Sequence, residues 1–324
     1  MPAYDTIRLI NIILHLYYVD GLTQSEISQR LGLSTAKVNR LHQQARDEGY
    51  VNITIRTPFQ QLFDLEDRLK AVFGLQDAIV IPTLAESGSS SLNSLGSVAA
   101  DFLLKHLRDG DIVAITPGTS VRSIVQALDS SRSYHIEVVP VLGAIQGEIE
   151  SDMNYLSTNM AERLGGKSYQ LHAPAFVDTK EHCDMLRSMP PVKNILDIAR
   201  KANIALLGVG TMDADVSRIV QFTALSAQDL KHIADDCGGV GEIGAYIYDI
   251  EGRPTALEYA DRVVGLSLAE IRAIPYRIGI AASAAKALPI YGALRGGYLH
   301  TLVTDEAAAR GVLAIFDQNF RKLS

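Results

Sequence analysis

The sequence lacks the features that take a protein into or across a membrane. No apolar run among its 324 residues approaches the roughly 20 residues that a membrane-spanning helix needs. The first residues, Met1 to Asp5, show no basic segment leading into an apolar one, which is the pattern of a secretory signal. We therefore expect a cytoplasmic protein that does not associate with a membrane.

Cysteine is almost absent. Cys183 and Cys237 are the only two, they lie far apart, and neither belongs to a Cys-x-x-Cys pair. This usage excludes a disulfide framework and a structural zinc site of the usual spacing. His182 adjoins Cys183 but has no partner at metal-ligand spacing, and the other histidines are scattered. We expect no metal ion and no cofactor.

Positive charge is also scarce over most of the chain. The sequence has 30 basic and 37 acidic residues, a formal net charge of -7. Residues 1 to 56 hold 6 of the basic and 5 of the acidic residues, which gives +1 and leaves -8 for the remainder. Because an acidic surface repels phosphate, only the N-terminal segment is electrostatically suited to nucleic acid.

The length of the chain indicates a small domain followed by a large one. We predict a DNA-binding domain over residues 1 to 56, a linker helix over 57 to 76, and a ligand-binding and oligomerisation domain over 77 to 324. Val51, Ile53 and Ile55 alternate like a short strand before the linker helix. Within the linker helix, an apolar seam that offers a subunit contact is formed by Leu62, Leu65, Leu69 and Val72.

The N-terminal segment predicts three helices joined by short turns. Residues Tyr4 to Val19 have apolar side chains at spacings of three and four. Thr23 and Glu26 form a capping box at the start of a second helix. Gly32 supplies the left-handed residue that ends this helix, and Ser34 caps a third helix that runs to Gly49. Two helices joined by a glycine-containing turn are typical of the helix-turn-helix that reads DNA.

The outward face of the third helix is the candidate DNA-reading surface. Asparagine and glutamine pair with adenine and arginine pairs with guanine in the major groove, while hydroxyls at a helix start suit backbone phosphates. The candidates are Ser34, Thr35, Ala36, Asn39, Arg40 and Gln43. A helical hairpin of some other purpose is the alternative. We expect double-stranded operator DNA as the partner.

From Ala78 onward, β-branched runs alternate with helical stretches, which predicts a parallel sheet covered by helices on both faces, a doubly wound α/β fold. The predicted strands are 78–81, 112–116, 136–141, 168–172, 204–208, 276–281 and 299–303. The predicted helices are 92–107, 120–128, 153–164, 192–201, 227–235 and 284–294. The serine-rich stretch 87–91 is expected to be a loop. Ligands of such sheets bind beyond the carboxyl ends of the strands.

The stretch Ile115 to Ser120 predicts a strand that ends in a glycine turn before a helix, and free amides there can bind an anion. A plain strand-to-helix turn is the alternative. Two other glycine patterns are rejected. Gly239 to Gly244 matches a dinucleotide fingerprint but follows a helix, so we expect a loop that presents Glu242. Gly165 to Ser168 imitates a phosphate loop but follows a helix too, and we interpret it as a helix stop.

The segment from Leu22 to Ser34, continued by Lys37 to Leu41 and Gly49, resembles the DNA-binding segment of the SorC family of sugar-operon regulators. The segments 239–249 and 286–305 also resemble this family. The resemblance covers nearly the whole chain. It implies a C-terminal domain similar to sugar-phosphate isomerases and a sugar or sugar-phosphate effector. It also implies a homo-oligomer, which is a dimer at least and by family likeness a tetramer.

The resemblance also implies which polar residues near strand ends surround that effector. They are Gly118, Thr119, Ser120, Gly143, Asp152, Asn154, Gly208, Gly210, Glu242 and Lys286. For any one of them, the alternative is an exposed surface residue that takes no part in binding. The family usually has a glycine-rich strand end before the lysine, whereas this chain has Ala281, Ala282 and Ser283, a departure that bears on the size of the pocket.

Two other functions compete with regulation. A sugar-phosphate isomerase or deaminase would need a positioned base and a positioned acid. The sequence shows no histidine and carboxylate at a spacing that indicates such a catalytic pair. A DNA-binding architectural protein would leave the whole α/β domain without a role. We therefore predict a transcription regulator of a carbohydrate or polyol operon and no enzymatic activity.

Overall fold

The computed structural model describes residues 4–51, 59–83, 88–130, 132–145, 152–213, 217, 219–222 and 225–323. The chain forms two compact units, Met1–Pro58 and Phe59–Ser324. The strand expected around Ile53 and Ile55 lies outside the described residues.

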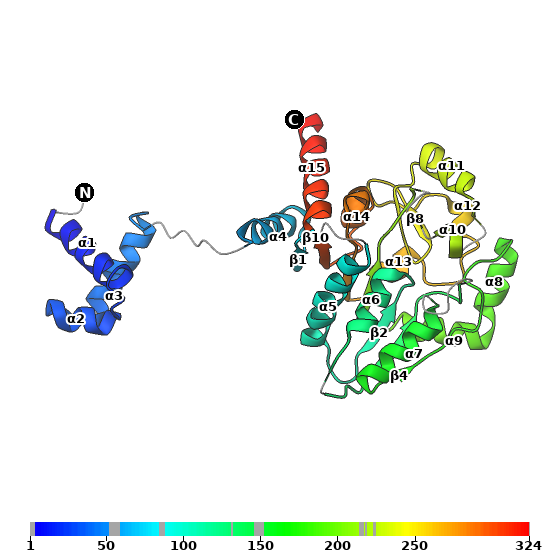
Figure 1. Ribbon diagram of the computed structural model, residues 1–324, viewed down its shortest axis with the longest axis horizontal. Coiled ribbons are helices and arrows are strands. Elements are labelled where there is room, and N and C mark those ends of the chain that lie inside the picture. Colours follow the sequence, from blue (N-terminus) through cyan, green and yellow to red (C-terminus); the bar gives the residue numbers. More distant parts are fainter. Residues whose placement is uncertain are drawn as a thin grey trace. The chain divides into compact units, whose positions relative to one another are not determined.

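The first unit consists of helices α1 (Tyr4–Tyr18), α2 (Gln24–Leu31) and α3 (Thr35–Asp47) (Figure 1). The Thr23 hydroxyl accepts the amide of Glu26, and the Glu26 carboxylate accepts the amide of Thr23, so the predicted capping box is confirmed. Gly32 has φ 64° and ends α2 in the left-handed conformation. The Ser34 hydroxyl accepts the amide of Lys37 at the start of α3. Both ends of the turn between α2 and α3 are therefore fixed by local hydrogen bonds.

A small apolar core holds these three helices together. Each helix contributes side chains that are almost fully buried, namely Ile10, Ile13, Leu16, Ile27, Val38, Leu41 and Ala45. On α3 the buried side chains occupy one side, which leaves the opposite side of the helix free to face outward.

A seven-stranded, entirely parallel sheet is the centre of the second unit. Its strand order is β1-β10-β9-β5-β2-β3-β4. The strands are β1 (Asp77–Ile81), β2 (Ile112–Ile115), β3 (Glu137–Pro140), β4 (Lys167–Ser168), β5 (Ile204–Gly208), β9 (Tyr276–Ile280) and β10 (Thr301–Asp305). Neighbouring strands β9, β5, β2 and β3 therefore end side by side at one edge of the sheet.

Helices cover both faces of this sheet, as a doubly wound fold requires. One face packs against α5 (Gly88–His106), α6 (Thr119–Ala127) and α7 (Met153–Leu164), which lie side by side in Figure 1. The other face packs mainly against α4 (Gln60–Phe73), α9 (Pro190–Ala199), α13 (Leu268–Arg272), α14 (Ala287–Arg295) and α15 (Glu306–Leu323). The remaining helices are α8 (Lys180–Ser188), α10 (Ile219–Phe222), α11 (Ala227–Cys237) and α12 (Leu257–Ala260). The predicted α/β class is confirmed.

A second, three-stranded antiparallel sheet contains β6 (Gly210–Thr211), β7 (Gly241–Ile243) and β8 (Tyr246–Tyr248). The sequence placed Glu242 on a loop, and this was wrong because it lies in the middle of β7. Gly244 and Ala245 both have positive φ, at 57° and 66°, and they form the two-residue turn between β7 and β8. Gly241 and Gly244 of this segment therefore belong to a β-hairpin.

The predicted strand 168–172 was also wrong, because β4 contains only Lys167 and Ser168. The amide and carbonyl of Leu171 bond instead to the side chain of Asn154, which takes the chain out of the sheet. Three other elements differ from the prediction in where they begin or end. Helix α5 begins at Gly88 within the expected loop, β10 lies two residues later than expected, and a 3₁₀ turn, Ala284–Lys286, precedes α14.

The apolar seam of α4 is not available for a subunit contact. Leu62, Leu65 and Leu69 are buried in the core of the second unit. The Phe73 ring at the end of α4 packs edge-on against Tyr291 of α14 and Phe316 of α15, each at 5.8 Å between ring centres. The helix expected to link two domains is thus part of the larger one.

Candidate DNA-binding and effector-binding sites

The six predicted DNA-reading residues are all exposed on or next to α3. Ala36, Asn39, Arg40 and Gln43 lie opposite the buried Val38, Leu41 and Ala45. The Gln43 amide donates to the Asp47 carboxylate at 2.9 Å, which orients it along the helix. Thr35 shares a hydrogen bond of 3.1 Å with Ser28 of α2 and so ties the two helices of the motif together.

At the end of β2, the turn into α6 has the form that an anion site requires. Gly118 has φ 123° and immediately precedes α6, and no side chain caps the helix. Thr119 and Ser120 are half-buried at its first turn. The buried Thr116 hydroxyl accepts the amide of Gly208 at 2.8 Å, which joins this turn to the end of β5. Free amides and two hydroxyls therefore gather between two neighbouring strand ends.

Glu242 and Lys286 form the charged part of the site. The strand register sets Glu242 opposite Gly210, where a Cβ would lie only 1.9 Å from the carboxylate Oε1. Gly210 is thus needed for the carboxylate to occupy its position. The other oxygen, Oε2, accepts the amide of Ala245 at 3.0 Å. Lys286 ends the 3₁₀ turn that follows β9.

The two charges act on each other in a largely desolvated setting. Burial raises the pKa of the Glu242 carboxyl, while the ammonium of Lys286 and the amide of Ala245 oppose that rise. Burial lowers the pKa of Lys286, and the Glu242 carboxylate opposes that fall. A carboxylate and an ammonium that have lost much of their hydration bind hydroxyls and anionic groups more strongly than exposed ones do.

Gly143, Asp152 and Asn154 lie beyond the end of β3, and their polar groups already have partners within the chain. The Asp152 carboxylate accepts the amides of Asn154 and Tyr155 and caps α7. Asn154 binds the backbone of Leu171 through both ends of its amide. A Cβ on Gly143 would lie 2.4 Å from the Ala173 carbonyl, so the glycine permits a close approach of two chain segments.

The structure thus brings the predicted effector residues together as three neighbouring groups at the carboxyl edge of β9, β5, β2 and β3. Sequence reasoning missed Thr116 and Asp305. Asp305 accepts the amides of Ser283 and Ala308 and the hydroxyl of Thr83, so it joins the ends of β1, β9 and β10. Its place in the segment resembling the regulator family was the one signal that pointed to it.

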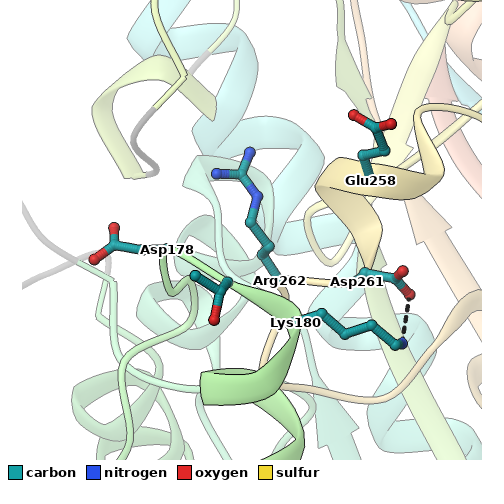
Figure 2. Close-up of a pocket in the computed structure, with 6 residues that line it drawn as sticks. Asp178, Lys180, Glu258, Asp261 and Arg262 are labelled. Carbon is teal, nitrogen blue, oxygen red and sulfur yellow. Dashed lines mark hydrogen bonds and ion pairs between the residues drawn. The ribbon is translucent and has the colours of Figure 1, made fainter.

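A pocket of about 470 Å³ lies elsewhere, at the start of α8 and the end of α12, and includes none of the predicted residues. Figure 2 shows Lys180 reaching the Asp261 carboxylate, at 3.1 Å, on one wall. The Arg262 guanidinium covers the Phe176 ring at 4.5 Å. Because none of the predicted effector residues lines this pocket, we do not assign the effector to it. Among the described residues, no three metal-ligating side chains gather and no helix has the length and apolarity of a membrane span.

Comparison with known families matches both units. Residues 57–314 match the family described as "Putative sugar-binding domain", and residues 12–48 match region 4 of sigma-70 factors. The second match falls on α1 to α3, the three helices that carry the candidate DNA-reading surface.

Comparison with individual proteins gives the same result over nearly the full length. The sorbitol operon regulator of Klebsiella pneumoniae is 30% identical over 97% of this chain and 100% of its own. The crystal structure of this full-length regulator, SorC, superposes with a TM-score of 0.73 over 95% of this chain and 99% of that one. The transcriptional regulator LsrR of Escherichia coli K12 is 30% identical over 92% of each chain. The erythritol catabolism regulatory protein EryD of Brucella abortus is 28% identical over 92% of this chain and 94% of its own.

Proposed function

Because the chain belongs to the SorC family of sugar-binding transcriptional regulators, we propose that a sugar or sugar phosphate at the carboxyl edge of its parallel sheet controls how its helix-turn-helix binds an operator. The chain is a transcriptional regulator that joins a DNA-binding unit to a sugar-binding domain. Its relatives are named as regulators of sorbitol and erythritol genes, so the operon serves a carbohydrate or polyol.

The observation that supports this proposal is the mutual effect of the Glu242 and Lys286 charges in a desolvated setting, together with the uncapped start of α6 at the carboxyl end of β2. A sugar offers many hydroxyls, which a carboxylate such as Glu242 accepts. Its phosphate, where there is one, suits the free amides of Gly118 to Ser120 and the ammonium of Lys286. Asp152 and Asn154 would take part through the acceptor and donor capacity that their bonds within the chain leave over.

Sensing is favoured over turnover. The named relatives are regulators. The attached DNA-binding unit gives a bound ligand something to control. We propose that the protein works in the cytoplasm as a homo-oligomer, a tetramer in keeping with the family resemblance, since operators with paired half-sites need at least two reading units.

A thermal-unfolding screen of sugars, polyols and their phosphates tests the proposed site. A ligand at 100 times its dissociation constant should stabilise the protein by about 2.7 kcal/mol. Glu242→Gln and Lys286→Met should each lose this stabilisation. Lys231→Met, which removes an exposed lysine of α11, is the matched control and should keep it. A ligand that stabilises all four proteins equally would place the effector elsewhere.

A further inference from the structure

Asp305, the last residue of β10, carries a buried carboxylate that is fully engaged within the chain. The residue is 3% exposed. Its Oδ1 accepts the amides of Ser283 and Ala308, each at 3.0 Å, and its Oδ2 accepts the Thr83 hydroxyl at 3.2 Å. A carboxylate with three donors and almost no exposure has little capacity left for a ligand. Any effect of Asp305 on a bound effector must therefore pass through the residues that it holds.

The backbone of Ser283 is in a conformation that needs support. Its φ of 92° and ψ of 151° lie in a region that glycine adopts readily and other residues rarely. No side chain caps the 3₁₀ turn, Ala284–Lys286, that begins directly after it. The bond from the Ser283 amide to the Asp305 carboxylate favours this conformation over the extended or helical ones that serine prefers. Glycine at this place would need no such bond.

Lys286 is tied to the same serine. Its amide donates to the Ser283 carbonyl at 3.0 Å. The 3₁₀ turn also contacts β6, a strand of the small sheet that carries Glu242. Beyond the turn, a Cβ on Gly311 of α15 would lie only 2.6 Å from the Cβ of Ala287, so α15 packs closely on the residue that follows Lys286. The backbone that presents the lysine is thus held on both of its sides.

We propose that Asp305 is a positioning residue of the effector site, whose carboxylate holds the strained backbone of Ser283 and thereby sets the position of Lys286. This inference rests on the proposed function, in which Lys286 is the cation that meets the effector. The desolvation of Lys286 reports its position, because burial lowers the pKa of its ammonium, and the Glu242 carboxylate opposes that fall. A lysine released from this place would reach water and regain its ordinary pKa.

NMR titration of isotope-labelled lysine ε carbons in the full chain measures this pKa without any ligand, and Lys286→Met identifies the signal. In the native protein Lys286 should titrate below the ordinary lysine range. Asp305→Ala should move its pKa up into that range, because the Ser283 turn relaxes and the side chain reaches water. Thr83→Val is the matched control. It removes the donor to the other oxygen of the same carboxylate and should leave the Lys286 pKa unchanged.

A second substitution separates positioning from general support of the fold. Since glycine adopts the conformation of Ser283 unaided, Ser283→Gly combined with Asp305→Ala should return the Lys286 pKa to its native value. A carboxylate that only supported the fold would leave the Lys286 pKa of the folded protein unchanged when it is removed. A native Lys286 pKa in folded Asp305→Ala, or the absence of rescue in the double variant, would therefore contradict the proposal.

Should Asp305→Ala fail to fold, Ser283→Thr takes its place, because a β-branched side chain is strongly disfavoured at positive φ. It should raise the Lys286 pKa, whereas Ala284→Thr, at an exposed neighbour without positive φ, should not. A native Lys286 pKa in Ser283→Thr would overturn the proposal. Because the titration uses no ligand, a thermal screen in which no sugar, polyol or phosphate stabilises the protein would count against the proposed function alone.

Discussion

Ser283 is the residue at which the backbone departs most from what its side chain favours. Its φ of 92° and ψ of 151° belong to a region that glycine occupies almost exclusively. The Asp305 carboxylate accepts the Ser283 amide at 3.0 Å and holds this conformation. Three residues later the chain presents Lys286. Where the family usually has a glycine-rich segment, this chain therefore has a serine whose backbone is strained, three residues before Lys286.

This strain predicts a stabilising substitution. Ser283→Gly should raise the free energy of unfolding by about 1 kcal/mol, because relief of the strain exceeds the entropy that glycine adds to the unfolded chain. Ala282→Gly is the control. Ala282 has no positive φ, so this change should lower stability by about 0.5 to 1 kcal/mol. Urea denaturation measures both. A loss of stability in Ser283→Gly as large as that in Ala282→Gly would contradict the account.

At the residue scale, the sequence predicts what kind of contact a side chain can make better than which partner it contacts in the fold. Glu242 and Asn154 both looked like ligand acceptors near strand ends. In the structure Asn154 binds the backbone of Leu171, whereas Glu242 keeps one carboxylate oxygen without a hydrogen bond to any described residue. The difference depends on which segment the fold brings alongside each residue, and no local pattern records this.

Helix α3 carries the DNA-reading surface, and two of its cations should behave differently. Arg40→Ala should weaken operator binding by about 1 to 3 kcal/mol and relax base preference at one position of each half-site. Lys37→Ala, which removes a cation from the flank of the helix, should weaken binding to operator and random DNA alike. Binding-site selection followed by titration of both DNAs separates the two effects. An equal loss on both DNAs for Arg40→Ala would show that this residue touches only phosphate.

Helix α4 should contribute to the stability of the larger unit. Leu69 is fully buried, so Leu69→Ala should cost about 2 to 5 kcal/mol of unfolding free energy. Phe63 is 49% exposed on the same helix, and Phe63→Ala should change stability by roughly 0.5 kcal/mol or less. Chemical denaturation followed by circular dichroism measures both. Were Leu69→Ala as mild as Phe63→Ala, α4 would be a linker after all.

At the element scale, sequence succeeded where a regular period or a cap was present. Helix α7 was predicted with its observed bounds, and the helix-turn-helix was predicted with its caps, because these signals are local. The β7–β8 hairpin was missed because Tyr246, Ile247 and Tyr248 are all buried and do not alternate. Strand β4 was overpredicted because a side chain from α7 takes over the backbone bonds that would have extended it.

The whole molecule divides its chemistry between two units. The segment 1–56 carries a formal charge of +1, and the remainder carries -8. A sugar site within an acidic domain does not compete for DNA, and the reading unit meets phosphate without much repulsion of its own. Ligand binding regulates only if the ligand prefers one arrangement of the DNA-binding units over another, and coupling of this kind amounts to about 1 to 3 kcal/mol.

The most direct test is the affinity of the full chain for its selected operator, measured by fluorescence anisotropy with and without the ligand found in the thermal screen. The ligand should change the operator dissociation constant of the native protein by about 5-fold to 150-fold. Lys286→Met should bind the operator as the native protein does without ligand, and the ligand should leave its affinity unchanged. An operator affinity of the native protein that is the same with and without a saturating ligand would contradict the account.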